Sequence, residues 1–249
     1  MSLLAQALAQ GLRHETARGP APDGAVLVAG AVGRAGEALL NRALAEHAGR
    51  GGVGGREVVA LAAGPMAMGL RGLRLAALDA LPALDSAFIL LSEADDTEAR
   101  SFYGRDLPFA QVHAQTCVHV ARTAVARGAR RIVLISPTPA WRQIGRFHTG
   151  LADGVELELA GLPLESLVVL RPVRNTRRAG VSLVERFVSV YLSIQLLMMP
   201  RTLEAITSEK LARCALAAMR AAKPGVSVFA ADAIPDLLEL PAAPVQCAP

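Results

Sequence analysis

The sequence is poor in lysine and in tyrosine. Of its 26 basic residues only two are lysines, Lys210 and Lys223, so arginine carries nearly all of the positive charge. The two tyrosines, Tyr103 and Tyr191, are not followed by lysine four positions later. A Tyr-x-x-x-Lys pair is therefore absent from the whole chain, which excludes any chemistry that depends on that pair.

Cysteines and long apolar runs are also scarce. The three cysteines, Cys117, Cys214 and Cys247, are widely separated, which excludes a disulfide framework and indicates a reducing, cytoplasmic environment. The most apolar stretch, 187–199, has 13 residues, whereas a membrane span needs about 20. Residues 1–24 lack the basic start and continuous apolar stretch of a signal peptide, and they predict a short amphipathic helix and a loop.

The charge pattern limits the choice of partner. The net charge is +4, the arginines are spread along the chain, and only 4% of residues are aromatic. A nucleic-acid groove needs a basic stripe with interleaved aromatic residues, so we expect no nucleic-acid partner. The densest basic cluster is Arg171, Arg174, Arg177 and Arg178, which is either a solvated loop or an anion site.

Apolar runs and helical periods alternate along the chain. Strands are predicted at 25–30, 56–64, 73–79, 86–92, 130–137, 166–172 and 226–231, and helices at 33–47, 107–127, 141–160, 181–199 and 208–222. This alternation is typical of a doubly wound α/β fold with a mostly parallel, Rossmann-type sheet. We expect one domain over 25–240 with a small C-terminal helical region for a substrate or partner, and a loose tail at 241–249.

The first predicted strand runs into a glycine-rich loop and then directly into a helix. In this loop Gly30 permits a tight turn, Gly33 lets the backbone approach a pyrophosphate, and Gly36 lets the helix pack against the strand. The intervening loop positions are Ala31, Val32 and Arg34. Helix N–H groups and the helix dipole would then face the phosphates. The pattern predicts dinucleotide binding, and the alternative is a tight strand–helix turn without a ligand.

The end of the second strand bears on the choice between NAD and NADP. An acidic residue there would bind the ribose 2′-hydroxyl of NAD, but residues 61–64 read Leu-Ala-Ala-Gly. Arg34 lies inside the glycine loop, and guanidinium groups suit a 2′-phosphate. The sequence therefore favours NADP over NAD. Arg71 and Arg74 follow soon after, but surface solubility is the preferred interpretation of these two.

Five segments together resemble the atypical short-chain dehydrogenase/reductases that bind NAD(P), most closely the Tat-interacting-protein and NmrA-like branches. The segments are VLVAGAVGRAG (26–36), LAALD (75–79), FILLS (88–92), VARGARRIVLISP (125–137) and LVVLRPV (167–173). The GxxGxxG spacing of the loop is typical of this family. The resemblance spans residues 25–240.

The resemblance implies positions for the rest of the cofactor. Asp79 would lie near the adenine ring, Leu91 and Ser92 would line the ribose and nicotinamide, and Pro172 and Val173 would border the nicotinamide end. Each residue also has a simpler interpretation. Asp79 could be an ordinary loop or capping aspartate, Ser92 a hydroxyl that satisfies backbone groups at a strand end, and Pro172 a strand terminator.

The same resemblance shows where this chain departs from the family. Active members use a tyrosine with a lysine four residues later, together with a serine at the end of the fifth strand. Ser136 stands at the serine position, but the other two positions fall near His148 and Ala152. No tyrosine or lysine occurs anywhere in 104–190, so no shift of the alignment restores the pair. His148 is a candidate proton donor beside Ser136, and a surface histidine is the alternative.

Metal chemistry is not expected. His113 and Cys117 are one helical turn apart, but no third ligand lies nearby, so a structural helix face is the preferred interpretation.

Two functional hypotheses follow from these observations. The first is an NAD(P)-binding sensor, scaffold or regulatory protein without standard dehydrogenase catalysis. The second is an NADP-dependent oxidoreductase that acts on a quinone or another small carbonyl acceptor with an unusual proton donor. The apolar segment 183–199 is expected to form core, a lid over a small-molecule pocket, or a homodimer contact.

Overall fold

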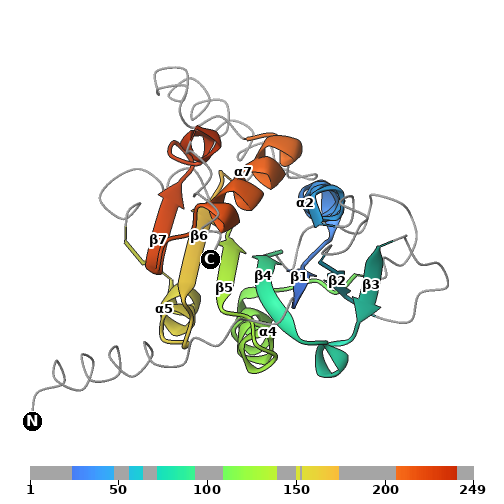
Figure 1. Ribbon diagram of the computed structural model, residues 1–249. Helices are drawn as coiled ribbons and strands as arrows, with labels where there is room; N and C mark the ends of the chain where they lie inside the picture. Colours follow the sequence, from blue (N-terminus) through green and yellow to red (C-terminus); the bar gives the residue numbers. More distant parts are fainter. Residues whose placement is uncertain are drawn as a thin grey trace, which may run out of the picture.

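The structure, a computed structural model, describes residues 24–47, 56–63, 72–92, 109–138, 150–151, 153–173 and 206–239. Within them, seven strands form one sheet in the order β3-β2-β1-β4-β5-β6-β7 (Figure 1). The strands are β1 (Ala25–Ala29), β2 (Val58–Leu61), β3 (Leu73–Ala76), β4 (Leu84–Leu90), β5 (Arg131–Ile135), β6 (Ser166–Arg171) and β7 (Gly225–Ala230). All six neighbouring pairs are parallel, so this sheet is wholly parallel where the sequence predicted a mostly parallel one.

Helices cover both faces of the sheet, as a doubly wound fold requires. The α-helices are α2 (Gly33–His47), α4 (Ala114–Ala126), α5 (Gly154–Ala160) and α7 (Ser208–Arg220), and the short 3₁₀ helices are η1 (Leu78–Ala80) and η5 (Pro235–Leu238). Figure 1 shows α2 and α7 on one face and α4 and α5 on the other. The predicted fold class is confirmed. Among the helices in these residue ranges, none has both the length and the apolarity that a membrane span requires.

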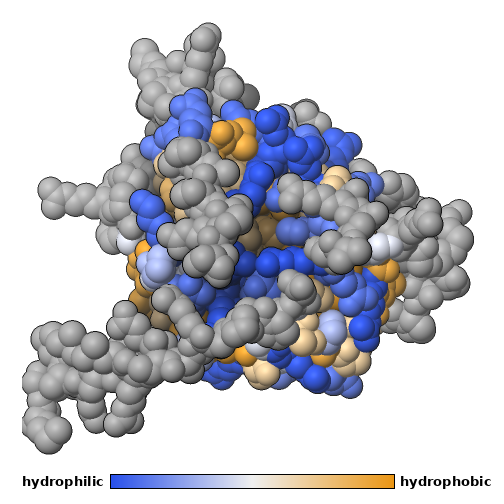
Figure 2. All heavy atoms as spheres, in the orientation of Figure 1, coloured by the Kyte–Doolittle hydropathy of each residue, from blue (hydrophilic) through white to orange (hydrophobic). Residues whose placement is uncertain are grey.

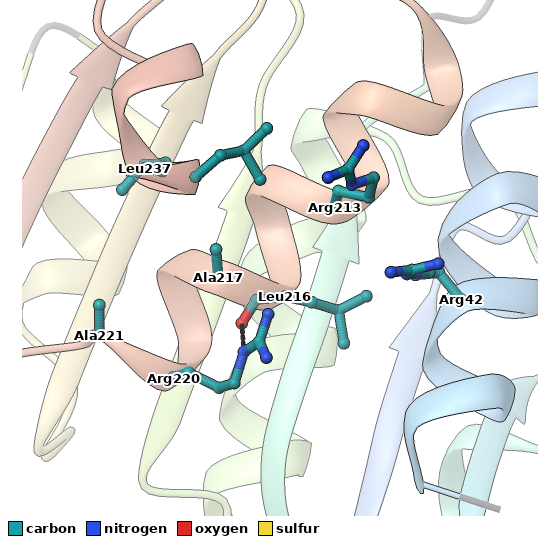
Figure 3. A pocket seen from close by; sticks show the side chains of 8 residues that line it. Arg42, Arg213, Leu216, Ala217, Arg220, Ala221 and Leu237 are labelled. Carbon is teal, nitrogen blue, oxygen red and sulfur yellow. Dashed lines mark hydrogen bonds between the residues drawn. The ribbon is translucent and has the colours of Figure 1, made fainter. Parts of the chain in front are cut away.

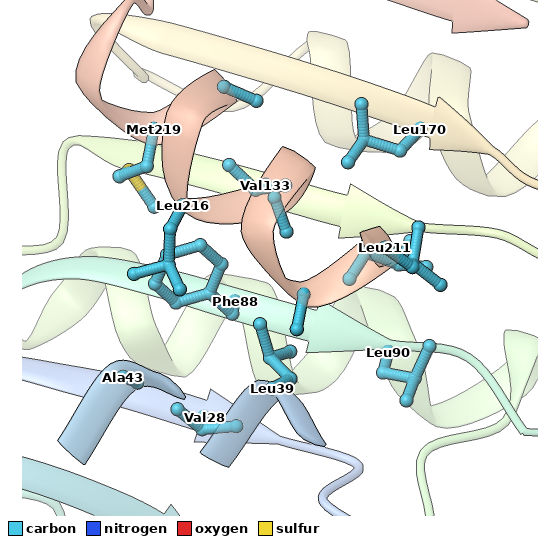
Figure 4. Close-up of a cluster of buried hydrophobic side chains, with 14 of the residues drawn as sticks. Val28, Leu39, Ala43, Phe88, Leu90, Val133, Leu170, Leu211, Leu216 and Met219 are labelled. Atoms are coloured by element: carbon cyan, nitrogen blue, oxygen red, sulfur yellow. The ribbon is translucent and has the colours of Figure 1, made fainter. Parts of the chain in front are cut away.

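Two apolar cores explain why the strands are continuous apolar runs. On the α2/α7 face, Val28 and Phe88 from the sheet pack with Leu39 of α2 and Leu216 of α7 (Figure 4). On the α4/α5 face a second core includes Leu27, which alternates with Val28 along β1. Successive residues of a strand point to opposite faces, so a strand with cores on both sides must be apolar at every position. All five residues of β1 are buried accordingly.

Several predicted boundaries were wrong: the strands predicted at 56–64 and 86–92 are Val58–Leu61 and Leu84–Leu90, and three further differences have a structural reason. The helix expected from residue 107 begins at Ala114, because residues before it are extended: Phe109 bridges to Ala62, and the Ala110 N–H donates to the Leu61 carbonyl at 2.8 Å. These bonds to the end of β2 satisfy backbone groups that would otherwise favour a helix. The helix expected over 141–160 is helical, in its described part, only from Gly154. The third strand ends at Ala76 because η1 follows.

Several predicted segments lie outside the described residues. These are the N-terminal helix and loop before residue 24, the tail at 241–249, and the apolar segment 183–199 with its predicted core, lid or homodimer contact. His148, Ala152 and Arg71 lie outside the described residues as well.

Candidate functional site

The candidate site lies where the sheet reverses its winding. From β1 the chain moves to β2 and β3 on one side, and β4 returns to the other side of β1 and continues toward β7. In parallel sheets the crevice at the carboxyl ends of the strands, at such a switch point, is where ligands bind. Here the residues that follow β1 and β4 are the glycine loop at 30–36 and the pair Leu91 and Ser92.

Two glycines of the loop are required by close backbone packing. Gly30 has φ +78°, and a Cβ atom there would lie 2.1 Å from the carbonyl oxygen of Leu90. At Gly36 a Cβ atom would lie 2.5 Å from the carbonyl carbon of Ala31. Any larger residue would therefore push the loop away from β4 or away from the start of α2. These contacts hold the strand–loop–helix turn tightly against the sheet.

Gly33 differs from the other two glycines because its surroundings are open. Its φ is +70°, a conformation that glycine adopts without strain, and a Cβ atom there would meet no heavy atom within 4 Å. Gly33 is also the first residue of α2, which has no acidic residue in its first turn. The first turn of an α-helix presents N–H groups that have no acceptor within the helix, and it carries partial positive charge. The loop thus offers open space next to a helix end suited to an anion.

The residues after β4 are held at the same edge by backbone hydrogen bonds. The Leu91 N–H donates to the Ile135 carbonyl at 2.9 Å, and the Ser92 N–H donates to the Val112 carbonyl at 2.7 Å. The Nδ1 atom of His113, the residue that precedes α4, lies 2.9 Å from the Ser92 carbonyl oxygen. The sequence did not predict this contact, because the only neighbour considered for His113 was Cys117, one helical turn further along the chain.

Ser136 and Pro172 also meet at the carboxyl edge. The Ser136 N–H donates to the Leu170 carbonyl at 2.8 Å, and the Thr138 N–H donates to the Pro172 carbonyl at 2.9 Å. The Thr138 hydroxyl donates to the Ser136 carbonyl at 3.0 Å. The ends of β5 and β6 are therefore joined, and these residues share an edge with the glycine loop.

Asp79 lies in η1 and is exposed. Its carbonyl oxygen accepts a hydrogen bond from Nη2 of Arg127 at 2.6 Å, and Arg127 is the residue that caps the C-terminus of α4. Asp79 is thus anchored on the α4 side of the sheet. Its expected proximity to an adenine ring stays a prediction. Within the described ranges, no group of three His, Cys, Asp or Glu side chains has the geometry of a metal site.

A buried ion pair supports the β6 side of the edge. Arg171, the last residue of β6, is 5% exposed, and Glu156 of α5 is 2% exposed. The Arg171 Nε donates to Glu156 Oε1 at 2.9 Å, its Nη2 donates to Glu156 Oε2, and Nη2 also donates to the Gly150 carbonyl at 2.7 Å. The sequence placed Arg171 in a solvated loop or an anion site, which is wrong for this residue. The rest of its cluster lies outside the described residues.

Cys117 on α4 is completely buried, and burial raises the pKa of its thiol from 9.0 to about 12. The folded protein therefore holds this proton more tightly than the unfolded chain between pH 9 and 12, so stability must fall as pH rises through that window. Between pH 8 and pH 10 we expect the wild type to lose about 1.4 kcal/mol of unfolding free energy more than Cys117→Ala. Urea unfolding of both proteins at the two pH values measures this difference. An equal loss of unfolding free energy in wild type and Cys117→Ala would contradict the raised pKa of Cys117.

The all-parallel sheet, its strand order and the glycine loop at the switch point define a Rossmann-type architecture. No protein-family model matches the chain, and no curated protein matches its sequence.

Solved structures with a similar fold include three distant ones. Bordetella bronchiseptica WbmH in complex with NAD+ is 15% identical, with 83% of this chain and 75% of that chain covered and a TM-score of 0.46. An oxidoreductase of the short-chain dehydrogenase/reductase family from Burkholderia thailandensis is 19% identical, with 87% and 93% covered and a TM-score of 0.45. MoeE5 in complex with UDP-glucose and NAD is 17% identical, with 83% and 75% covered and a TM-score of 0.45. We draw no functional argument from likenesses this distant.

Proposed function

We propose that the protein binds a nicotinamide dinucleotide at the carboxyl edge of its sheet, with the pyrophosphate over the loop 30–36. The observation that carries this proposal is the contrast between the three glycines. At Gly30 and Gly36 a Cβ atom would collide with backbone, whereas at Gly33 it would enter open space beside the first turn of α2. A backbone pressed against the sheet with one open position at a helix N-terminus suits a bound pyrophosphate.

The remaining edge residues would receive the rest of the dinucleotide. Leu91 and Ser92 follow β4, next to the loop, and would line the ribose and nicotinamide. Pro172 follows β6 and would border the nicotinamide end. Bound NAD(P) supplies hydride transfer, and the chain itself supplies the binding surface and the orientation of the ring.

We infer that the protein acts as a dinucleotide-binding sensor or regulatory protein rather than as a standard dehydrogenase. The supporting observation is the lack of tyrosine and lysine throughout 104–190. A phenol with a nearby ammonium group is the usual source of the proton that accompanies hydride transfer in the family that this sequence resembles. Without the pair, the nucleotide would be held while the proton-transfer step lacks its usual groups.

A second candidate is an NADP-dependent oxidoreductase, and the position of Ser136 favours it. Ser136 stands at the carboxyl end of β5, joined through Thr138 to the residue that would border the nicotinamide. A hydroxyl there could orient a carbonyl group. Quinones and other electron-poor acceptors need little acid assistance, so they are the substrates that suit a site without the tyrosine. His148 is the proposed proton donor for this candidate.

Binding and turnover separate the two candidates. NADPH and NADH are titrated separately into the full chain while the nucleotide fluorescence is followed. Oxidation of the bound nucleotide is then measured with a panel of quinones, aldehydes and ketones. Saturable binding without turnover supports the regulatory function. Turnover that falls in Ser136→Ala supports the oxidoreductase instead. If neither nucleotide binds, both candidates fail together.

The preference for NADP is expected to depend on Arg34. This side chain is exposed in the first turn of α2, and β2 is followed by Ala62 and Ala63 rather than by an acid. Arg34→Ala should weaken NADP binding about tenfold and leave NAD binding unchanged, because a charge-assisted hydrogen bond to the 2′-phosphate is lost. Calorimetric titration with both nucleotides measures this. Arg122→Ala, an exposed change on α4, is the control, and equal weakening of NAD and NADP by Arg34→Ala would contradict the assignment.

A further inference from the structure

A cavity lies on the outer surface of the α2/α7 layer, apart from the carboxyl edge of the sheet. It has a volume of about 260 Å³ and is formed by α2, α7 and η5 (Figure 3). Its lining residues are Arg42 of α2, Arg213, Leu216, Ala217 and Arg220 of α7 with the adjacent Ala221, and Leu237 and Leu238 of η5. None of them belongs to the loop 30–36 or to the strand ends that form the proposed dinucleotide site.

The spacing of residues along α7 explains why the surface is hollow here. Arg213, Ala217 and Ala221 are four positions apart and therefore form one row along the helix. Because the two alanines carry only a methyl group each, the surface is hollow along this row, next to Leu216 on α7 and Leu237 on η5. Figure 2 shows apolar surface flanked by hydrophilic surface over α7 and η5. Leu216 and Leu237 are themselves buried, so the apolar part of the cavity floor comes from the half-buried Ala217, Ala221 and Leu238, and the rest of the lining is polar.

Guanidinium groups surround this floor, and their ion pairs are weak. Arg42 projects from α2 toward α7 in Figure 3, and its Nη1 lies 4.0 Å from Glu209 Oε1. The Nε of Arg220 lies 3.6 Å from Glu46 Oε1. Both arginine side chains are about half exposed, so water screens these pairs strongly. Arg213 has no ion-pair partner in the described part of the chain. Three arginine side chains thus border the cavity, and only two carboxylates form ion pairs with them, both of them weak.

We propose that this cavity binds a small amphipathic organic anion, with a phosphate or carboxylate head among the three arginines and a short apolar tail against Ala217, Ala221 and Leu238. Guanidinium groups present planar pairs of N–H donors that match the oxygens of these head groups. The volume is slightly below the range of about 300–1,000 Å³ that is usual for drug-sized ligands, which indicates a short tail. This proposal does not depend on the proposed function.

The test is a calorimetric titration of the full chain with four probes: hexyl phosphate, hexanoate, inorganic phosphate and hexanol. We expect hexyl phosphate or hexanoate to bind at least about tenfold more tightly than inorganic phosphate or hexanol, since each of those lacks one half of the ligand. Preference between the two acids identifies the head group. Equal binding of inorganic phosphate would show a charged patch only, and equal binding of hexanol would show an apolar hollow only. Either result, or no binding of any probe, would overturn the proposal.

Four variants locate the binding. Arg213→Gln removes the cation without an ion-pair partner, and Ala217→Leu fills the floor without changing charge. Each should weaken binding of the preferred acid about tenfold. Arg213→Gln is an exposed change, so it keeps the test valid if Ala217→Leu fails to fold. Arg122→Gln on α4 and Gly33→Asp in the loop should leave binding unchanged. Loss of binding in Gly33→Asp alone would place the anion at the loop and contradict the proposal.

Discussion

Replacing Gly33 by aspartate is expected to abolish dinucleotide binding. A side chain at this position enters the open space over the first turn of α2, where the proposed pyrophosphate lies. Two unit charges about 4 Å apart repel by about 4 kcal/mol at an effective dielectric of about 20, which corresponds to about a thousandfold in affinity. Calorimetric titration with NADP would measure the change, and an affinity within a factor of about three of wild type would contradict the proposed site.

The main complication is backbone strain, because Gly33 has φ +70° and a non-glycine residue there costs about 1–2 kcal/mol. Gly225 provides a matched control. It has φ +98°, its Cβ position is equally open, and it begins β7 at the opposite edge of the sheet. Gly225→Asp should therefore show a comparable loss of stability with unchanged NADP affinity. Gly33→Ala separates strain from charge, and we expect its affinity to lie between those of Gly33→Asp and wild type.

Replacing Arg171 by methionine is expected to cost about 3–5 kcal/mol of unfolding free energy. The substitution leaves the Glu156 carboxylate buried without its bidentate partner, and it also removes the donor to the Gly150 carbonyl. The large effect is expected because a buried carboxylate loses its charged partner. Urea unfolding at neutral pH measures the loss, and a change below about 1 kcal/mol would show that the pair contributes little.

The double variant Arg171→Met/Glu156→Leu is the matched control for this pair. Replacing a whole buried ion pair by apolar side chains is often close to neutral, so the double variant should recover most of the stability that Arg171→Met loses. A second comparison is Arg122→Met, which breaks the pair between Arg122 Nη2 and Glu158 Oε2 at 3.4 Å, where both side chains are about 60% exposed. That loss should stay below about 1 kcal/mol.

The sequence predicted the sheet well because the strands are buried on both faces. Residues 25–29 and 131–135 are apolar at almost every position, and such runs separated by helical periods leave few alternatives to a parallel sheet. The glycine loop was equally accessible, since three glycines at fixed spacing between a strand and a helix have a specific steric meaning. In the structure, the short distances between a Cβ atom built at Gly30 or Gly36 and the neighbouring backbone show this steric requirement directly.

The sequence could not predict contacts that depend on tertiary packing. Arg171 stands in a run of arginines, and its burial depends on Glu156, which belongs to another element 15 residues away. The available signal was an arginine that directly ends an apolar strand, with a glutamate 15 residues earlier on a short helix. The start of α4 was misplaced for a similar reason, because residues 109–110 bond to the end of β2, whose proximity is not encoded locally.

The central claim is that the carboxyl edge of the sheet binds a nicotinamide dinucleotide, and thermal unfolding of the full chain with NADP and with NAD tests it most directly. A ligand at about 100 times its dissociation constant stabilises the folded state by about 2.7 kcal/mol, which for a chain of this size raises the melting temperature by about 5–10 °C. We predict such a rise with NADP, a smaller one with NAD, and none in Gly33→Asp. An unchanged melting temperature of the wild type with both nucleotides at millimolar concentration would contradict the account.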